Sequence, residues 1–348
     1  MCNQLRWRGF PWGEMLPRSL VIAGAALAGL ALSVPALFAE NCLSASDMGE
    51  ATGSALSSAA QHYFDLIAKG DTASLRQAAI VSVAGDFSAI ETTVKNNQAA
   101  LAGSKATARP PFVLEAEGAA PIARAEFYCG VFGSSGQTRD SAVFYLDNLP
   151  PGDYGVVVLD ATSPKTAHTV SLILQKQGSE WKLGGLYIKD MQSAGHESSW
   201  YAERARDFAS KGQSHNAWFY YVEARSLVSP LPFMSTAVTD KLYDESQKLE
   251  PGDLPGDGKT VDLSAGAGNY KLSAIFPEVV GDDLDLVVKY QVADVSNTTQ
   301  SYQMNVALMK ALLAKYPELK SAFAAVVARA VDASGHDYGT MLAMKEIK

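Results

Sequence analysis

The pattern of apolar and polar residues first follows the period of a helix. Between residues 51 and 79 apolar residues recur every three or four positions, and Gly70-Asp71 interrupts the run before it restarts. The same spacing continues over residues 87–101, after an acidic residue that suits a helix start. These residues therefore predict a helix, a turn and a second helix, followed by a further helix.

From residue 111 onward the period shortens to that of β-strands. Segments rich in Val, Tyr, Phe and Leu alternate with Gly, Pro, Asn and Asp, which are turn residues. At residues 154–159 odd and even positions are both apolar, so both faces of this sheet are covered or one face lines a pocket. The pattern predicts a mostly antiparallel meander over residues 112–117, 123–132, 141–147, 154–160, 169–175 and 181–189.

Helical spacing returns after residue 190. It predicts a helical hairpin over residues 198–228 and a third helix over residues 236–249, within a region that extends from 196 to 250. One hairpin has one internal interface, which is too little for all of its aromatic side chains. We therefore expect another domain or another chain to cover part of this aromatic cluster: Trp200, Trp218, Phe219, Tyr220 and Tyr221.

The clearest predicted linker is the Pro- and Gly-rich segment at residues 251–258. Beyond it, residues 259–348 predict a small α+β domain with strands near 270–276 and 284–292, two helices and a last strand over 338–347. Apolar stripes mark the two helices: Leu308, Leu312 and Leu313 on the first, and Leu319, Phe323, Val326 and Val327 on the second.

The first 39 residues have the order of a secretory signal, with a basic start, an apolar run and small residues before polar sequence. Cleavage is expected after Ala39, with Ala36 as the other site that fits. An uncleaved anchor is the competing interpretation, because about twenty apolar residues suffice to span a bilayer. Pro35 and the many Ala and Gly residues oppose it. We expect a periplasmic or secreted protein with no stable membrane span after cleavage.

Composition narrows the classes of partner and cofactor. Loss of three Arg and one Glu with the signal moves the formal net charge from −8 to −10, and an acidic surface argues against nucleic acid. No two of the 5 His stand at metal-ligand spacing, so we expect no metal or cofactor. Of the 3 Cys, Cys42 and Cys129 remain after cleavage. They form a disulfide or are two unrelated thiols.

Two segments carry a resemblance to a known fold. The run His62-Tyr63-Phe64-Asp65-Leu66-Ile67-Ala68-Lys69-Gly70-Asp71, followed by a sheet ending on Gly178-Ser179-Glu180-Trp181-Lys182-Leu183, resembles the nuclear-transport-factor-two-like superfamily with its polyketide-cyclase-like members. This resemblance implies a cone-like sheet around a helix over residues 52–190, with a cavity that members use for catalysis, binding or dimerisation. The sequence departs from the catalytic members, because it has no clear Asp/His or Asp/Tyr pair placed for their chemistry.

Other resemblances are more local. Residues 144–154, with Pro150-Pro151-Gly152, are similar to the turn of small exported β-sandwich modules, although Pro followed by Gly suits any tight hairpin. The spacing of small and aromatic residues in 198–230 resembles a single tetratricopeptide-type hairpin. Plain helical packing is the alternative, since such units need stacked neighbours to bury their faces. The overall expectation is an α+β fold: a cone-like domain, a helical hairpin and a small α+β domain.

The cone-like fold would bring aromatic side chains together in one cavity. Alternation along a strand would place Trp181, Leu183 and Tyr187 on one face. These side chains line an apolar ligand cavity or form the core. The candidate cavity residues are Tyr63, Phe64, Phe127, Tyr145, Trp181 and Tyr187.

The sequence favours an exported bacterial envelope protein that acts as a non-catalytic binding or interaction module. Its expected partner is another envelope protein or a small apolar ligand. One alternative is an enzyme that uses the aromatic-lined cavity, with an acid/base drawn from His62, Asp65 or Tyr63. The other is a purely structural envelope protein. No residue is assigned a catalytic role.

The export signal leads to the first prediction. Mass spectrometry of the secreted or periplasmic fraction should show a mature amino terminus at Glu40 or Leu37, because the small residues before them suit signal peptidase. Recovery of the intact chain in membranes would establish the anchor instead.

Overall fold

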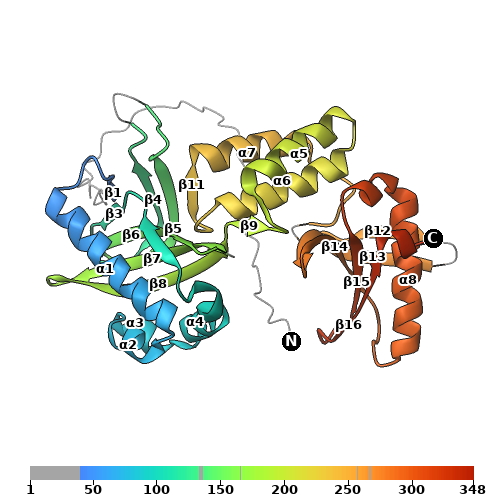
Figure 1. Ribbon diagram of the computed structural model, residues 1–348, viewed down its shortest axis with the longest axis horizontal. Helices are drawn as coiled ribbons and strands as arrows, with labels where there is room; N and C mark the ends of the chain where they lie inside the picture. The colour runs from blue at the N-terminus through green and yellow to red at the C-terminus, as the bar shows by residue number, and fades with distance from the viewer. Residues whose placement is uncertain (1–39, 133–135, 165, 257, 266–267) are drawn as a thin grey trace, which may run out of the picture.

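The computed structural model describes residues 40–132, 136–164, 166–256, 258–265 and 268–348 (Figure 1). The predicted export signal lies outside these residues. The fold is α+β, as the hydrophobic pattern predicts. In Figure 1 a block built from residues 40–190 lies on one side, a group of helices follows it, and the C-terminal residues form a block on the other side.

Helices open the first block, in the order α1 (Glu50–Lys69), α2 (Thr72–Gln77), α3 (Val81–Gly85) and α4 (Ser88–Leu101). α1 ends at Gly70, whose φ of 72° is a left-handed conformation that glycine adopts without a steric penalty. Asp71 then caps α2 by accepting a hydrogen bond from Ser74 N at 3.0 Å. The predicted turn at Gly70-Asp71 is confirmed.

The strands of the first block divide between two sheets. They are β1 (Glu40–Leu43), β2 (Lys105–Ala108), β3 (Phe112–Ala116), β4 (Ile122–Cys129), β5 (Ala142–Leu149), β6 (Gly152–Thr162), β7 (Ala167–Gln177), β8 (Glu180–Asp190) and β11 (Met234–Thr236). The larger sheet has the order β1-β3-β6-β7-β8, with β2 also paired to β6, and the smaller has the order β11-β5-β4. Every pairing is antiparallel, and the predicted strands are confirmed as β3 to β8.

β6 is buried on both faces because a different layer covers each face. Val157 and Leu159 belong to the core under the helices, whereas Tyr154 and Val156 belong to the core shared with β4 and β5. Gly155 is needed on the helix side, since a Cβ there would lie 2.2 Å from Leu56 Cδ2 of α1. The predicted double coverage of this strand is confirmed.

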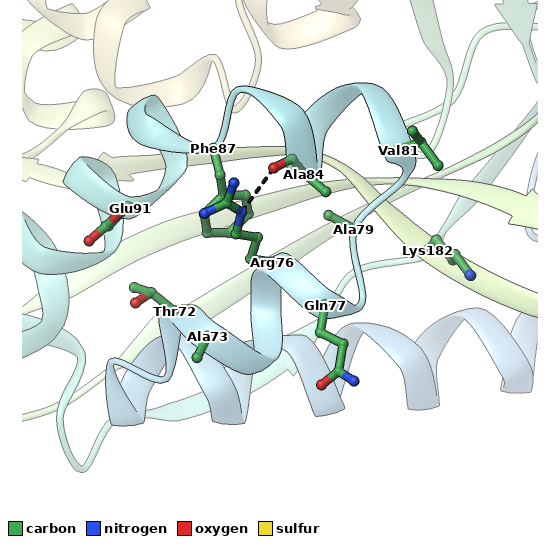
Figure 2. Close-up of a pocket in the computed structure, with 10 residues that line it drawn as sticks. All are labelled: Thr72, Ala73, Arg76, Gln77, Ala79, Val81, Ala84, Phe87, Glu91 and Lys182. Atoms are coloured by element: carbon green, nitrogen blue, oxygen red, sulfur yellow. Dashed lines mark hydrogen bonds between the residues drawn. The ribbon is translucent and has the colours of Figure 1, made fainter.

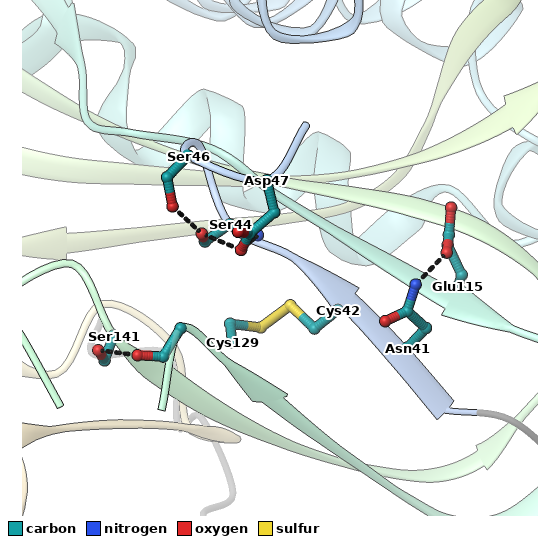
Figure 3. The surroundings of a disulfide bond; sticks show 9 residues. Asn41, Cys42, Ser44, Ser46, Asp47, Glu115, Cys129 and Ser141 are labelled. Carbon is teal, nitrogen blue, oxygen red and sulfur yellow. Dashed lines mark hydrogen bonds between the residues drawn. A yellow bond between two sulfur atoms is a disulfide. The ribbon is translucent and has the colours of Figure 1, made fainter. Parts of the chain in front are cut away.

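A disulfide joins the two sheets at one end of the block (Figure 3). It links Cys42 on β1 to Cys129 on β4, with their Cα atoms 5.1 Å apart, inside the usual range for such bonds. Near it, the Glu40 carboxylate accepts a hydrogen bond from the backbone N–H of Glu126 on β4 at 2.8 Å. The start of the described chain is therefore attached to both sheets.

A helical hairpin follows, as predicted. It consists of α5 (Ser198–Ser210) and α6 (Ser214–Val228), preceded by the short pair β9 (Gln192–Ser193) and β10 (His196–Glu197) and followed by α7 (Ala237–Gln247). Ala205, Ala217 and Ala224 are fully buried, which lets the helices approach closely. Thr236 caps α7 through a reciprocal hydrogen-bond pair with Thr239.

The C-terminal block is a sheet with α8 (Thr298–Lys315) beside it. The sheet has the order β12 (Val261–Ala265), β13 (Gly268–Val280), β14 (Asp283–Gln291), β15 (Ala325–Val331) and β16 (Asp337–Ala343), and its β14–β15 pair is parallel. Short 3₁₀ turns lie at Pro317–Ser321 and Met344–Glu346. The predicted strands near residues 270–276 and 284–292 are confirmed.

The prediction of a second helix in this block is wrong. The chain makes one 3₁₀ turn after Pro317, and Val326 and Val327 then lie in β15, paired with Leu286 and Val287 of β14. Burial alternates along β15, which is the pattern of a strand. Val326 and Val327 are β-branched and pack well on the surface of a sheet. Their pairing with β14 therefore outweighs the helix-like spacing of the apolar residues that the sequence shows here.

The helical hairpin and the C-terminal sheet share one core. Phe219 packs edge-to-face on Phe323, and the Tyr220 hydroxyl donates to the Ala322 carbonyl oxygen at 2.7 Å. Leu254, in the predicted linker, packs against the same core. The segment 251–258, described apart from residue 257, thus joins α7 to β12 along a packed surface.

The disulfide gives the second prediction. It closes a loop with a sequence separation of 87, which on the chain-entropy model contributes roughly 4.5 kcal/mol to the free energy of unfolding. The double variant Cys42→Ser/Cys129→Ser should lose about that amount in urea unfolding, and the wild type in reductant should match it. Alkylation of two thiols in the unreduced, denatured protein would contradict the pairing.

Candidate functional site

The predicted aromatic cavity residues lie in different layers of the first block. Tyr63 and Phe64 of α1 are buried in the core between the helices and the larger sheet, and Trp181 is partly buried against the same core. Phe127 is fully buried between the two sheets. Tyr145 lies half-buried on β5, and Tyr187 is 36% exposed and contacts Phe233 edge-to-face. The structure therefore does not bring the six side chains together.

A β-bulge explains why alternation fails along β8. The register with β7 shifts between Ile173 and Leu174, where Gly184 is the extra residue. Leu183 and Leu186 therefore face the helices, while Tyr187 faces away from them. The prediction that Trp181, Leu183 and Tyr187 share one face is wrong. The extra residue in the bulge moves each later side chain of β8 to the opposite face of the sheet from the one that simple alternation predicts.

The acid/base residues of the enzyme alternative are also apart. His62 and Asp65 lie on the exposed side of α1, and the Asp65 carboxylate accepts a hydrogen bond from Gln61 Nε2 at 2.9 Å. The Tyr63 hydroxyl is buried and donates to the carbonyl oxygens of Ala78 and Trp181. Burial raises the Tyr63 pKa. Tyr63 thus acts as a structural link between α1, the end of α2 and β8.

An open groove of about 710 Å³ lies beside α2, α3, α4 and β8 (Figure 2). The α2–α3 segment pairs with the edge of β8, since Ile80 N donates to the Leu183 oxygen at 3.0 Å. Apolar side chains form much of the groove lining, and Val81 is 85% exposed. The lining residues are Thr72, Ala73, Arg76, Gln77, Ala79, Val81, Ala84, Phe87, Glu91 and Lys182.

The charges around this groove are predominantly basic. Arg76 Nε donates to the Ala84 carbonyl oxygen at 2.9 Å, which holds the guanidinium beside Phe87 (Figure 2). The carboxylate of Glu91 is paired with Lys95, and the hydrogen bond from that lysine lowers the Glu91 pKa. Lys182 Nζ lies 3.9 Å from Glu180 Oε2, so the rim keeps an excess of positive charge that is due mainly to Arg76. Such a rim, next to exposed apolar surface, suits a partner that offers a carboxylate and an apolar side chain.

A second cluster of polar groups joins three distant segments. His215, at the start of α6, lies 2.8 Å from Glu318 Oε1 through Nδ1 and 3.0 Å from Asp253 Oδ1 through Nε2. The Tyr316 hydroxyl donates to Asp253 Oδ2 at 2.9 Å. The cluster therefore ties the hairpin to residues 251–258 and to the 3₁₀ turn after α8.

The electrostatics of this cluster are coupled. Burial raises the pKa of Asp253, but the hydrogen bonds from His215 and Tyr316 outweigh it, and the net shift of the Asp253 pKa is downward. Burial and the bond to Asp253 raise the pKa of Tyr316. Sequence reasoning missed the cluster, because its members are separated by 38 and 103 positions from His215.

The aromatic cluster of the hairpin is covered mainly by its own chain. Tyr220 and Phe219 pack on the C-terminal block, and the Tyr221 hydroxyl donates to Glu245 of α7 at 2.9 Å. Trp200 and Trp218 are partly buried against the same core. Another domain thus covers this surface, which was one of the two outcomes expected from the sequence.

His196 in β10 and His336 just before β16 each stand between a glycine and an acidic residue, and neither pairs with that acidic residue. The His196 ring stacks on Trp200 with centroids 3.7 Å apart. His336 Nδ1 lies 3.2 Å from Asp332 within a turn, while Asp337 pairs with Arg329. Both histidines therefore make local contacts within their own segments.

No protein-family model, curated protein or solved structure matches the chain. The resemblances to the cone-like superfamily and to the tetratricopeptide-type hairpin stay predictions. Within the described ranges, no group of 3 or more His, Cys, Asp or Glu side chains is arranged to hold a metal ion. Of the helices in the part of the chain that the structure describes, none has the length and apolar character needed to cross a bilayer.

The His215 cluster gives the third prediction. Because the folded-state pKa of Asp253 is depressed, its contribution to stability is present above the unfolded pKa, near 3.8, and is lost as the pH falls through the folded value. Asp253→Asn should therefore lower the urea midpoint at pH 7, and the difference from wild type should shrink below about pH 4. Asp244→Asn, at an exposed position of α7, is the control. Equal destabilisation at pH 7 and pH 3 would contradict this role.

Proposed function

We propose that the mature chain works outside the cytoplasm, in the periplasm or after secretion, as a non-catalytic module that binds another envelope protein. The predicted export signal supports the location. The Cys42–Cys129 disulfide supports it independently, because such bonds persist in oxidising compartments.

The groove between α2, α4 and β8 is the surface that carries the proposal. Its decisive feature is Val81, 85% exposed at the start of a short helix, beside the basic side chains Arg76 and Lys182. A single exposed apolar side chain is ordinary on a protein surface, but Val81 lines the groove together with Ala79, Ala84 and Phe87, which gives a partner an apolar contact next to the two cations. At about 710 Å³ the groove accepts a protruding loop or a side-chain cluster of a partner.

The surrounding structure favours binding over chemistry in this block. The aromatic side chains that would have lined a reactive cavity are used for packing, and the Tyr63 hydroxyl is engaged by two backbone carbonyls. The groove is attached to the larger sheet through the Ala78–Ile80 segment on the edge of β8. A site built on a rigid sheet edge loses little conformational entropy when a partner docks.

The fourth prediction tests this surface in living cells. A photo-crosslinking amino acid replacing Val81 should give a discrete adduct with an envelope protein, whereas the same substitution at Val238, 49% exposed on α7, should not give it. The double change Arg76→Glu/Lys182→Glu should abolish the adduct, because it reverses the rim charge.

Two outcomes would contradict the proposal. One is the absence of an adduct at Val81 when the exported protein is folded, as judged by its thermal transition. The other is an adduct that also forms at Val238 or that persists after both rim charges are reversed. The double variant Lys241→Glu/Lys248→Glu is the matched charge control, since both lysines are exposed at α7 and lie outside the groove lining.

A further inference from the structure

A second groove, in the C-terminal block, lies between the edge strand β12 and α8. It has a volume of about 840 Å³ and is lined by Asp262, Leu263, Ser264, Ala307, Lys310, Ala311, Ala314 and Lys315. β12 ends the sheet order β12-β13-β14-β15-β16, so one side of it has no neighbouring strand. Figure 1 shows α8 next to this strand.

The backbone of β12 has hydrogen-bonding groups that point away from β13, at the open edge of the sheet. Ala265 pairs with Gly268 at the closing of the hairpin, which makes these two a hydrogen-bonded pair. Bonded and non-bonded pairs alternate along an antiparallel ladder, so Ser264 and Asp262 belong to the non-bonded pairs. Their N–H and C=O groups therefore point outward. Within the described residues, no backbone hydrogen bond beyond the ladder reaches them.

α8 supplies the opposite wall of the groove. Ala307 and Ala314 are exposed and Ala311 is half-buried, so small side chains leave room beside the strand. Lys310 is exposed on the same side, and Lys315 lies 4.0 Å from Asp253 Oδ2. The wall is thus apolar with a positive charge near its middle.

We propose that this groove binds an extended peptide segment of another protein, which adds a strand to β12 and places a carboxylate on Lys310. The unpaired strand edge determines the shape of the occupant, since only an extended chain satisfies a row of outward N–H and C=O groups. The wall of α8 selects its side chains: alternate residues would rest on the alanines, with an acidic residue opposite the lysine.

The charges favour a different protein over a second copy of this chain. In a two-fold pairing of β12 with itself, the α8 walls would face each other, and Lys310 and Lys315 would meet the same lysines of the other copy. Like charges brought together oppose such a dimer. For an acidic peptide the two lysines of α8 are attractive, and the one carboxylate of the lining, Asp262, belongs to the strand on the other side of the groove. The proposal concerns a different block from the Val81 groove, so either can fail without the other.

The fifth prediction uses synthetic heptapeptides and the full mature protein. The acidic probe is acetyl-Thr-Val-Thr-Glu-Thr-Val-Thr-amide with a fluorescent label, and it is long enough to pair along all 5 residues of β12. It should bind, as followed by fluorescence polarisation. Amide NMR shifts should concentrate on residues 261–264 and on the groove side of α8. A version carrying Lys in place of Glu, and a version with N-methylated backbone at alternate residues, should bind at least about tenfold more weakly.

Protein variants test each wall separately. Ser264→Pro removes an outward N–H at an edge position that tolerates proline, and should abolish binding of the acidic probe. Ala307→Arg fills the groove and should do the same, whereas Gln303→Arg, exposed on α8 outside the lining, should leave binding unchanged. Lys310→Glu should reverse the preference between the acidic and the basic probe. Thermal unfolding of each variant checks that the block is intact.

Three results would overturn the proposal. The first is no binding of the acidic probe at 1 mM to the folded protein. The second is binding that survives Ser264→Pro and Ala307→Arg, which would place the peptide elsewhere. The third is a dimer of the wild type in light scattering that Ser264→Pro dissociates, because a second copy would then occupy this edge.

Discussion

The burial of β6 on both faces is the constraint on which the first block depends. A strand with apolar residues at odd and even positions requires two covering layers, and here α1 with α4 supplies one and the β4–β5 sheet the other. The contact of Leu56 with Gly155 sets how closely α1 approaches. The disulfide then joins the two sheets, so the helices, the larger sheet and the smaller sheet form one stack.

Polar contacts also join the remaining parts of the chain. Lys189, next to the last residue of β8, donates hydrogen bonds to the carbonyl oxygens of Ser226 and Ser229 at the end of α6. Burial lowers the Lys189 pKa, and the nearby Glu223 carboxylate opposes that shift. At the other end of the hairpin, His215 is held by Asp253 and Glu318. The hairpin is therefore an internal connector, and its aromatic side chains serve that role.

Both candidate binding surfaces lie at an edge strand, β8 in the larger sheet and β12 in the C-terminal sheet. At β8 the Ala78–Ile80 segment supplies some of the missing backbone hydrogen bonds, so the groove there works through side chains, with Val81 and the two cations. At β12 the outward backbone groups stay available, so the groove there favours an extended chain. The difference in edge coverage gives the two surfaces different classes of occupant.

The sequence by itself determined many of the helices and strands but few of the contacts between them. Local periodicity and turn residues were enough for β3 to β8, for α1 and for the hairpin, because those signals act within a few residues. With two cysteines left after cleavage, the sequence allowed a disulfide or two separate thiols, and the structure shows the disulfide. The predicted aromatic cavity did not form, because a single bulge at Gly184 turns Tyr187 to the other face of the sheet. The two grooves were not predicted from the sequence. Val326 and Val327 became a strand only through pairing with β14, and His215 met its carboxylates only through packing of distant segments. Register, sheet partition and long-range contacts are set by tertiary packing, which a local pattern does not encode.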